Sequence, residues 1–194
     1  MNNVKKEIIT IAGNLGSGKS TTGKILAGIL GYKRYSSGDF MRKIAEERKI
    51  TLAELSAEAE ADESIDREID EYVKKIENKN KIVIDSRLAY HWIPESFKVF
   101  LSLPTQVGAE RMLADLQKNP TRAHEHKETP KSVEDVAKSV EERLASERKR
   151  YKELYGIANH TDPKNFDLVV DTEKNDAQKV AGIILEKYKE WLKN

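Results

Sequence analysis

Residues 7–23 read EIITIAGNLGSGKSTTG, and three patterns follow one another in this stretch. The apolar run at 8–12 is short enough for a buried strand. Residues 13–20 match G-x-x-x-x-G-K-S/T at every fixed position. Apolar residues then recur at helical spacing from Ile25 to Leu30. A strand, a glycine-rich loop and a helix in this order predict a loop that binds phosphate.

The residue types of this loop suit a nucleoside triphosphate. Glycines let successive backbone N–H groups turn toward an anion, and the start of the next helix adds a partial positive charge. Lys19 can reach the β- and γ-phosphates, and the Ser20 hydroxyl can bind Mg²⁺. The alternative is a glycine-rich turn that binds nothing, and the complete match favours the phosphate loop. The residues expected to hold ATP are Gly13, Asn14, Leu15, Gly16, Ser17, Gly18, Lys19, Ser20 and Thr21.

The composition limits the class of protein. With 194 residues, we expect a single domain over residues 1–194 with a sizeable core. The net charge of +1 gives no global reason to expect nucleic-acid binding, and the absence of cysteine excludes disulfides and thiolate metal sites. No apolar run approaches the roughly 20 residues that cross a bilayer. Residues 1–6 lack the apolar part of a signal peptide. We expect a cytoplasmic monomer without a membrane partner.

The order of the patterns predicts the fold class. Strand and helix alternate along the chain, which is typical of a parallel sheet covered by helices on both faces. We therefore predict an α/β protein with the three-layer P-loop NTPase fold and a five-stranded parallel sheet. After the first strand and helix, the remaining strands are expected near 32–35, 81–85, 98–103 and 166–171, and the last helix near 176–192.

Residues 36–42 read SSGDFMR and begin a helix near the phosphate loop. We expect Asp39 to cap this helix, and Phe40 and Ile44 to point inward. Arg42 lies one turn inside the helix, near the rim where strands end and helices begin. From its position alone, Arg42 could face the phosphate loop or could be a solvated helix arginine.

Residues 43–80 hold more helix than a connection between two strands needs. The sequence TLAE at 51–54 fits a capping box, and an apolar stripe marks another helix near 64–78. We expect these helices to form an insertion over the rim that binds a second substrate. The acidic run at 54–71 is expected to be a solvated face.

The strand at 81–85 ends in Asp85, at the carboxyl edge of the predicted sheet. In phosphate-loop proteins an acid in this place typically holds Mg²⁺, directly or through water. The alternative is a strand-end cap or ion pair. Arg87 follows two residues later on the same rim.

Residues 119–131 contain two prolines, charges of both signs and little to bury, so we expect a mobile loop. His124 and His126 are weak evidence for a metal because no further ligands accompany them. A long helix is then expected over 132–155. Its residues Arg143, Glu147 and Arg150 fall at i, i+4 and i+7, on one helical face.

Two guanidinium groups and a carboxylate on one face suit a polyanion with adjacent hydroxyls, although an ordinary ion-paired surface helix gives the same pattern. We find no Asn/Thr-Lys-x-Asp segment of the kind that reads guanine in a GTPase. Phosphoryl transfer between two anions needs many positive charges, and a lid that closes over them excludes water. The arginines outside the loop are Arg42, Arg87, Arg111, Arg122, Arg143, Arg148 and Arg150.

The chain resembles the nucleoside monophosphate kinases, because residues 36–42 are similar to their Ser-Thr-Gly-Asp-x-x-Arg segment. Adenylate kinases have Asp-Gly-Phe-Pro-Arg after the third strand, whereas this chain has DSRLA at 85–89. Residues 143–150 resemble the Arg-x-x-x-Asp-x-x-Arg of cytidylate kinases, with Glu147 in place of the aspartate. Residues 151–172 are similar to the compact archaeal type of that family.

The resemblance implies transfer of a phosphoryl group from ATP, with Mg²⁺, to CMP or dCMP. It implies acceptor-binding helices over about 39–80 and a lid over about 117–150. The implied catalytic residues are Lys19, Arg143 and Arg148, and the implied metal ligands are Ser20 and Asp85. The implied contacts to the acceptor come from Ser37, Arg42, Arg87, Arg143, Glu147 and Arg150.

Two other functions stay open. One is a kinase for a different acceptor, such as another nucleotide, shikimate or gluconate. The other is a non-catalytic ATP-dependent switch, which leaves the arginines of the rim unexplained.

Overall fold

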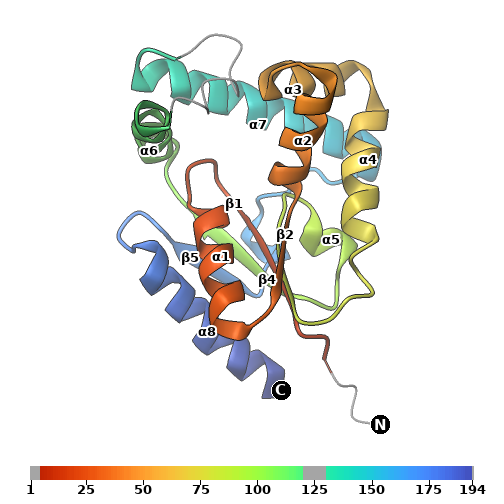
Figure 1. Cartoon of the computed structure of the whole chain (residues 1–194), viewed down its shortest axis with the longest axis vertical. Coiled ribbons are helices and arrows are strands. Elements are labelled where there is room, and N and C mark those ends of the chain that lie inside the picture. Colours follow the sequence, from red (N-terminus) through yellow and green to blue (C-terminus); the bar gives the residue numbers. More distant parts are fainter. Residues whose placement is uncertain (1–4, 120–129, 194) are drawn as a thin grey trace.

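Five parallel strands form one sheet in the order β2–β3–β1–β4–β5 (Figure 1). The computed structural model describes residues 5–119 and 130–193. The α/β fold with a five-stranded parallel sheet is as predicted. The strands are β1 (Ile8–Gly13), β2 (Lys33–Ser36), β3 (Ile82–Asp85), β4 (Phe97–Ser102) and β5 (Leu168–Asp171).

Helices cover both faces of the sheet (Figure 1). On one face, α1 and α8 bury Leu26 and Ile184 against β1, β3 and β4, and on the other face α4 and α5 pack against Ile8 and Ile84. The helices are α1 (Lys19–Leu30), α2 (Ser37–Arg48), α3 (Leu52–Ala61), α4 (Glu63–Lys74), α5 (Ala89–Trp92), α6 (Thr105–Lys118), α7 (Val133–Tyr155) and α8 (Ala177–Lys193).

The central strand β1 is buried at every position, as expected for a parallel strand covered on both faces. Its register pairs Ile11 with Asp85 on β3 and Gly13 with Leu101 on β4. The carboxyl ends of three strands therefore meet at one edge, where the glycine-rich loop begins.

Helices α2, α3 and α7 lie beyond this edge, and α7 crosses the top of the molecule in Figure 1. Helices α6 and α7 pack together through Ala109, Val136 and Val140. The expected loop at 119–131, with Arg122, His124 and His126, falls mostly outside the described residues. Within the described part of the chain, none of the helices is both long enough and apolar enough to traverse a membrane.

The cap of α2 differs from the prediction. The capping residue is Ser36, whose extended backbone lets its hydroxyl accept a hydrogen bond from the Asp39 backbone N–H at 3.2 Å. Asp39 therefore lies inside the first turn, and its carboxylate is free to contact other side chains. The predicted capping box at 51–54 is confirmed.

The acidic run at 54–71 is not a uniformly solvated face, because Asp66 and Asp70 of α4 are buried. Asp66 forms an ion pair with Nε of Arg150 at 2.7 Å. Asp70 accepts hydrogen bonds from Nε1 of Trp92 at 2.8 Å and from the Tyr155 hydroxyl. These contacts join α4 to α7, so the two carboxylates face a neighbouring helix instead of water.

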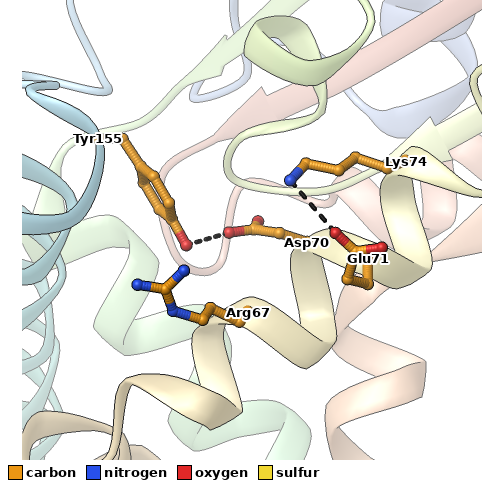
Figure 2. Close-up of a pocket in the computed structure, with 5 residues that line it drawn as sticks. All are labelled: Arg67, Asp70, Glu71, Lys74 and Tyr155. Atoms are coloured by element: carbon orange, nitrogen blue, oxygen red, sulfur yellow. Dashed lines mark hydrogen bonds and ion pairs between the residues drawn. The ribbon is translucent and has the colours of Figure 1, made fainter.

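Figure 2 shows a pocket at this junction, with the Tyr155 hydroxyl directed at Asp70. Its other lining side chains are also paired, since Glu71 contacts Nζ of Lys74 at 3.3 Å and Arg67 contacts Glu63 at 3.1 Å. The pocket is therefore lined by polar side chains that pair with one another or with their neighbours, where α4 meets the end of α7.

Candidate active site

The glycine-rich loop packs closely against α6. Gly16 has a left-handed backbone (φ +76°), and a Cβ there would lie 2.6 Å from the carbonyl oxygen of Gly108. Conversely, a Cβ on Gly108 would lie 2.5 Å from the carbonyl oxygen of Leu15. Only residues without a side chain fit at both positions. The sequence analysis did not single out Gly108, although an isolated glycine within a helix pattern is a known sign of close approach.

The loop encloses the Lys19 ammonium group. Nζ donates to the carbonyl oxygens of Gly13 at 2.9 Å and Asn14 at 2.7 Å. Burial and the neighbouring Arg87 hold the pKa of Lys19 well below its usual value. Among the described residues, the buried hydroxyl of Ser17 has no hydrogen-bond partner. This buried hydroxyl in a glycine-rich loop is available to donate a hydrogen bond to an oxygen atom of a bound anion.

A hollow lies beside the loop, between α6 and the connection from β5 to α8. Arg111 closes one side by donating to the carbonyl oxygen of Thr172 at 2.8 Å. The exposed Thr21 also faces this hollow. The further lining residues are Gly16, Ser17, Gly18, Thr22, Asn175, Asp176, Ala177 and Val180.

On the opposite side of the loop, one carboxylate holds two arginines. Glu147 of α7 is 3% exposed, and its Oε2 lies 2.9 Å from Nε of Arg87. Its Oε1 lies 3.1 Å from Nε of Arg143. Arg87 also donates to the Gly13 carbonyl oxygen at 2.9 Å, which brings the cluster to the phosphate loop.

The electrostatics of Glu147 follow from these neighbours. Burial alone would raise its pKa, but the attraction of Arg87 and Arg143 and a contact with His160 lower it far below the usual range. Nε2 of His160 lies 3.6 Å from Oε2, and this histidine is itself buried. The carboxylate is therefore charged across the physiological range, and it holds two guanidinium groups beside Lys19.

The other basic residues predicted on α7 point elsewhere. Arg150 contacts Asp66 on α4 and the Ser146 hydroxyl, so it does not join Arg143 at the loop. Arg148 is exposed. The face predicted from i, i+4 and i+7 spacing thus divides between the glycine-rich loop and helix α4.

Two residues of α2 predicted to bind the acceptor lie at its first two turns. Ser37 is buried, and Arg42 is partly exposed with its guanidinium on the Asp39 carboxylate. Asp39 also binds Arg34, and these bonds hold the pKa of Asp39 below its usual value although burial would raise it.

Asp85 lies at the carboxyl end of β3, beside Ser20. The Ser36 hydroxyl donates to its Oδ1 at 2.7 Å, and Nη2 of Arg34 lies 2.6 Å from its Oδ2. The same Nη2 donates to the Ser20 hydroxyl oxygen at 3.0 Å. The sequence analysis did not identify Arg34, because a basic residue in a short polar strand carries no distinctive pattern.

These residues fit a magnesium ion. A carboxylate oxygen and a hydroxyl oxygen converge there on one cationic group. Within the described residues, no three His, Cys, Asp or Glu side chains gather to make a protein-only metal cage. Mg²⁺ seldom uses such a cage, because it keeps several waters and binds through one or two protein oxygens together with substrate phosphates.

The glycine-rich loop lies at the carboxyl edge of a parallel sheet, with Arg87 from the end of β3 and Arg143 from α7 beside it. This arrangement is typical of the P-loop kinases. Residues 8–174 match the model of the cytidylate kinase-like family, and the chain belongs to that family.

Individual relatives agree with this assignment. The chain is 37% identical over 180 residues to a cytidylate kinase of Natronomonas pharaonis, covering 91% of this chain and 86% of that one. It is 36% identical over 182 residues to a cytidylate kinase of Haloarcula marismortui, covering 92% and 87%. The shikimate kinase of Acinetobacter baumannii in complex with shikimate has a similar fold, with a TM-score of 0.62, 16% identity and coverage of 96% and 95%.

Proposed function

We propose that this protein transfers the γ-phosphoryl group of ATP to CMP, giving ADP and CDP, and that it also accepts dCMP. Membership of the cytidylate kinase-like family supports the acceptor. The observation that carries the chemistry is the cluster at the phosphate loop, where Glu147 holds Arg87 and Arg143 close to Lys19. Two guanidinium groups fixed by one buried carboxylate, together with the nearby Lys19 ammonium group, suit the negative charge that spreads over a migrating phosphoryl group.

ATP is assigned to the loop formed by residues 13–21 and the adjoining hollow. The backbone N–H groups of the loop bind the phosphates, and the Ser17 hydroxyl is available to a phosphate oxygen. Lys19 exchanges its two carbonyl partners for phosphate oxygens, which is favourable because both partners are neutral. The nucleoside lies in the hollow beside Arg111 and Thr172.

Ser20 and Asp85 are assigned to the metal. A bound Mg²⁺ supplies positive charge to the phosphate oxygens during transfer. Ser36 orients the Asp85 carboxylate through its hydrogen bond to Oδ1. Asp85 therefore presents its other oxygen toward Ser20 and the phosphate loop.

CMP is assigned to the space between the loop and helices α2, α4 and α7. Arg42 binds its phosphate, Ser37 and Arg87 lie toward the base, and Glu147 and Arg150 act from α7. Arg87 already contacts the phosphate loop, so it can also reach the migrating group. Arg143 and Arg148 stabilise the charge that develops in transfer. The attacking phosphate oxygen of CMP is anionic, so the reaction needs no general base.

The test is ADP formation from ATP and Mg²⁺, with CMP, dCMP, UMP, AMP, GMP and shikimate offered separately. The proposal expects strong stimulation by CMP and dCMP, and its loss in Lys19→Met. Stimulation by AMP or shikimate instead would reject the acceptor but keep the phosphate chemistry. ATP binding without stimulation by any acceptor would favour a switch.

A further inference from the structure

Arg34 of β2 contacts oxygen atoms from three different elements. Nη2 donates to the Ser20 hydroxyl oxygen at 3.0 Å on α1 and lies 2.6 Å from Oδ2 of Asp85 on β3. Nη1 donates to Oδ2 of Asp39 on α2 at 2.9 Å. The Arg34 side chain is 15% exposed and the Asp85 side chain is 9% exposed, so the contact is largely shielded from water.

The oxygens of Ser20 and Asp85 converge on a single nitrogen atom. They are also the two oxygens that the proposed function assigns to Mg²⁺, and the inference rests on that assignment. Mg²⁺ binds oxygen at about 2.0–2.1 Å in a near-octahedral shell. A guanidinium group in contact with both oxygens occupies the space of this shell, and two cations cannot share it.

We propose that Arg34 is an internal counter-ion that takes the place of the metal while the site is empty, and that it must leave Ser20 and Asp85 when the metal binds. Arg34 is thus a positioning residue for the metal. It neutralises Asp85 in the free protein and raises the concentration of metal needed to load the site.

The contact between Arg34 and Asp85 has the features of an interaction that breaks when another cation binds. Nη2 approaches Oδ2 of Asp85 at ion-pair distance but without hydrogen-bond alignment. Within the described residues, Nε of Arg34 has no hydrogen-bond partner. A permanent buried guanidinium usually has its donors satisfied by aligned acceptors. Arg34 therefore neutralises the charge of Asp85 but leaves Oδ2 of Asp85 without a well-aligned hydrogen bond.

Arg34 has a second anion available when it leaves. Nη1 already binds Asp39, which lies on α2 outside the metal position. Movement about the side-chain torsions can therefore release Nη2 while the Asp39 bond is kept. The Asp39 carboxylate also binds Arg42, the residue assigned to the acceptor phosphate. Loading of the metal thus changes the charge balance at the acceptor side.

The test measures binding of Mn²⁺, in the absence of nucleotide, to the whole protein by the electron paramagnetic resonance signal of free Mn²⁺. Arg34→Met keeps an unbranched, flexible side chain and removes the guanidinium group with its charge. It is expected to bind Mn²⁺ at least tenfold more tightly than the wild type, and Asp85→Asn in the same background should abolish the gain. Arg34→Met should also unfold at a lower temperature without metal and recover part of the difference in Mg²⁺.

Arg48→Met is the matched control. Arg48 is an ion-paired arginine of α2 that contacts Glu58 and Glu68 away from the metal position, so its replacement should leave Mn²⁺ affinity unchanged. Arg34→Lys keeps the charge but lacks the fork that reaches two oxygens, and it should show a smaller gain. Should Arg34→Met fail to fold, Arg34→Lys provides the same comparison.

A folded Arg34→Met with wild-type Mn²⁺ affinity overturns the inference, as does a gain that survives Asp85→Asn. In the wild type, the side-chain NMR signal of Arg34 should shift when Mg²⁺ joins a non-hydrolysable ATP analogue, and an unchanged signal also contradicts the inference. The proposed function is tested separately by CMP phosphorylation in the wild type. Activity with CMP but no gain in Mn²⁺ binding rejects the role of Arg34 alone.

Discussion

Replacing Glu147 with glutamine removes one negative charge from the centre of the site while preserving the size of the side chain. In the wild type, its two oxygens lie 2.9 Å from Nε of Arg87 and 3.1 Å from Nε of Arg143, and the residue is 3% exposed. A glutamine amide has a single acceptor oxygen, so it can satisfy one of these guanidinium groups and neutralise neither. The two arginines then lie beside Lys19 without a counter-charge.

The expected loss is large because the pair is buried. Breaking a buried ion pair by removing the charge of one partner costs about 3–5 kcal/mol. For a domain of this size the midpoint of thermal unfolding should fall by about 10 °C. Arg87 and Arg143 also lose the group that positions them, and removal of such transition-state contacts lowers turnover by roughly 10²–10³-fold.

The way this loss of stability varies with pH follows from the lowered pKa of Glu147. Burial acts to raise the pKa of Glu147, but Arg87, His160 and Arg143 lower it below the value of about 4.3 expected in the unfolded chain. The stabilisation is therefore complete above about pH 5 and is lost as the pH falls through the folded pKa. The difference in unfolding free energy between wild type and Glu147→Gln should be constant from pH 6 to 8 and shrink in acid.

Urea unfolding at several pH values and steady-state kinetics with ATP and CMP measure these effects. Glu142→Gln, on the same helix, is the control, because Glu142 is exposed and contacts only the exposed Lys138 at 3.9 Å among the described residues. The control should change neither stability nor turnover. A Glu147→Gln protein that matches the control in both measurements would refute the assignment of Glu147 as the anchor of the two arginines.

Three further predictions follow from other contacts. Gly108→Ala should weaken ATP binding at least tenfold in calorimetry, because its Cβ would lie 2.5 Å from the Leu15 carbonyl oxygen, and unchanged affinity would show that the loop can shift without loss. Asp70→Ala should lower the free energy of unfolding in urea by about 2 kcal/mol, because the partly buried Nε1 of Trp92 loses its acceptor, and a neutral effect would mean that water replaces the carboxylate. Arg148→Ala should reduce turnover with unchanged thermal stability, since Arg148 is exposed in the free protein, and full activity would remove it from the catalytic set.

Much of the fold could be predicted because its signals are local. The run at 8–12, the glycine-rich pattern and the apolar spacing after it each depend on neighbouring residues, and β1, the loop and α1 follow them. The capping box at 51–54 and the long helix ending at Tyr155 are also local patterns, and both are confirmed. The exception was the cap of α2, where Ser36 and Asp39 are both good capping residues and pattern alone cannot choose between them.

The candidate site was predicted only in part. The sequence identified residues on the correct rim, since strand ends in a parallel sheet meet at one edge. It placed Arg143, Glu147 and Arg150 on one face of a helix, which is correct for the helix but does not reveal what the face meets. In the fold, Glu147 meets Arg87 from β3's end, whereas Arg150 meets Asp66 from α4.

The amino-acid sequence by itself determined the phosphate loop, the alternation of strands and helices and the family. The tertiary structure alone decided that Asp66 and Asp70 are buried and that Arg34 stands between Ser20 and Asp85. The physical reason is the range of the interactions. Secondary structure reflects neighbours within a few residues, but the charge state and burial of a side chain depend on groups that the folded chain brings together from distant positions.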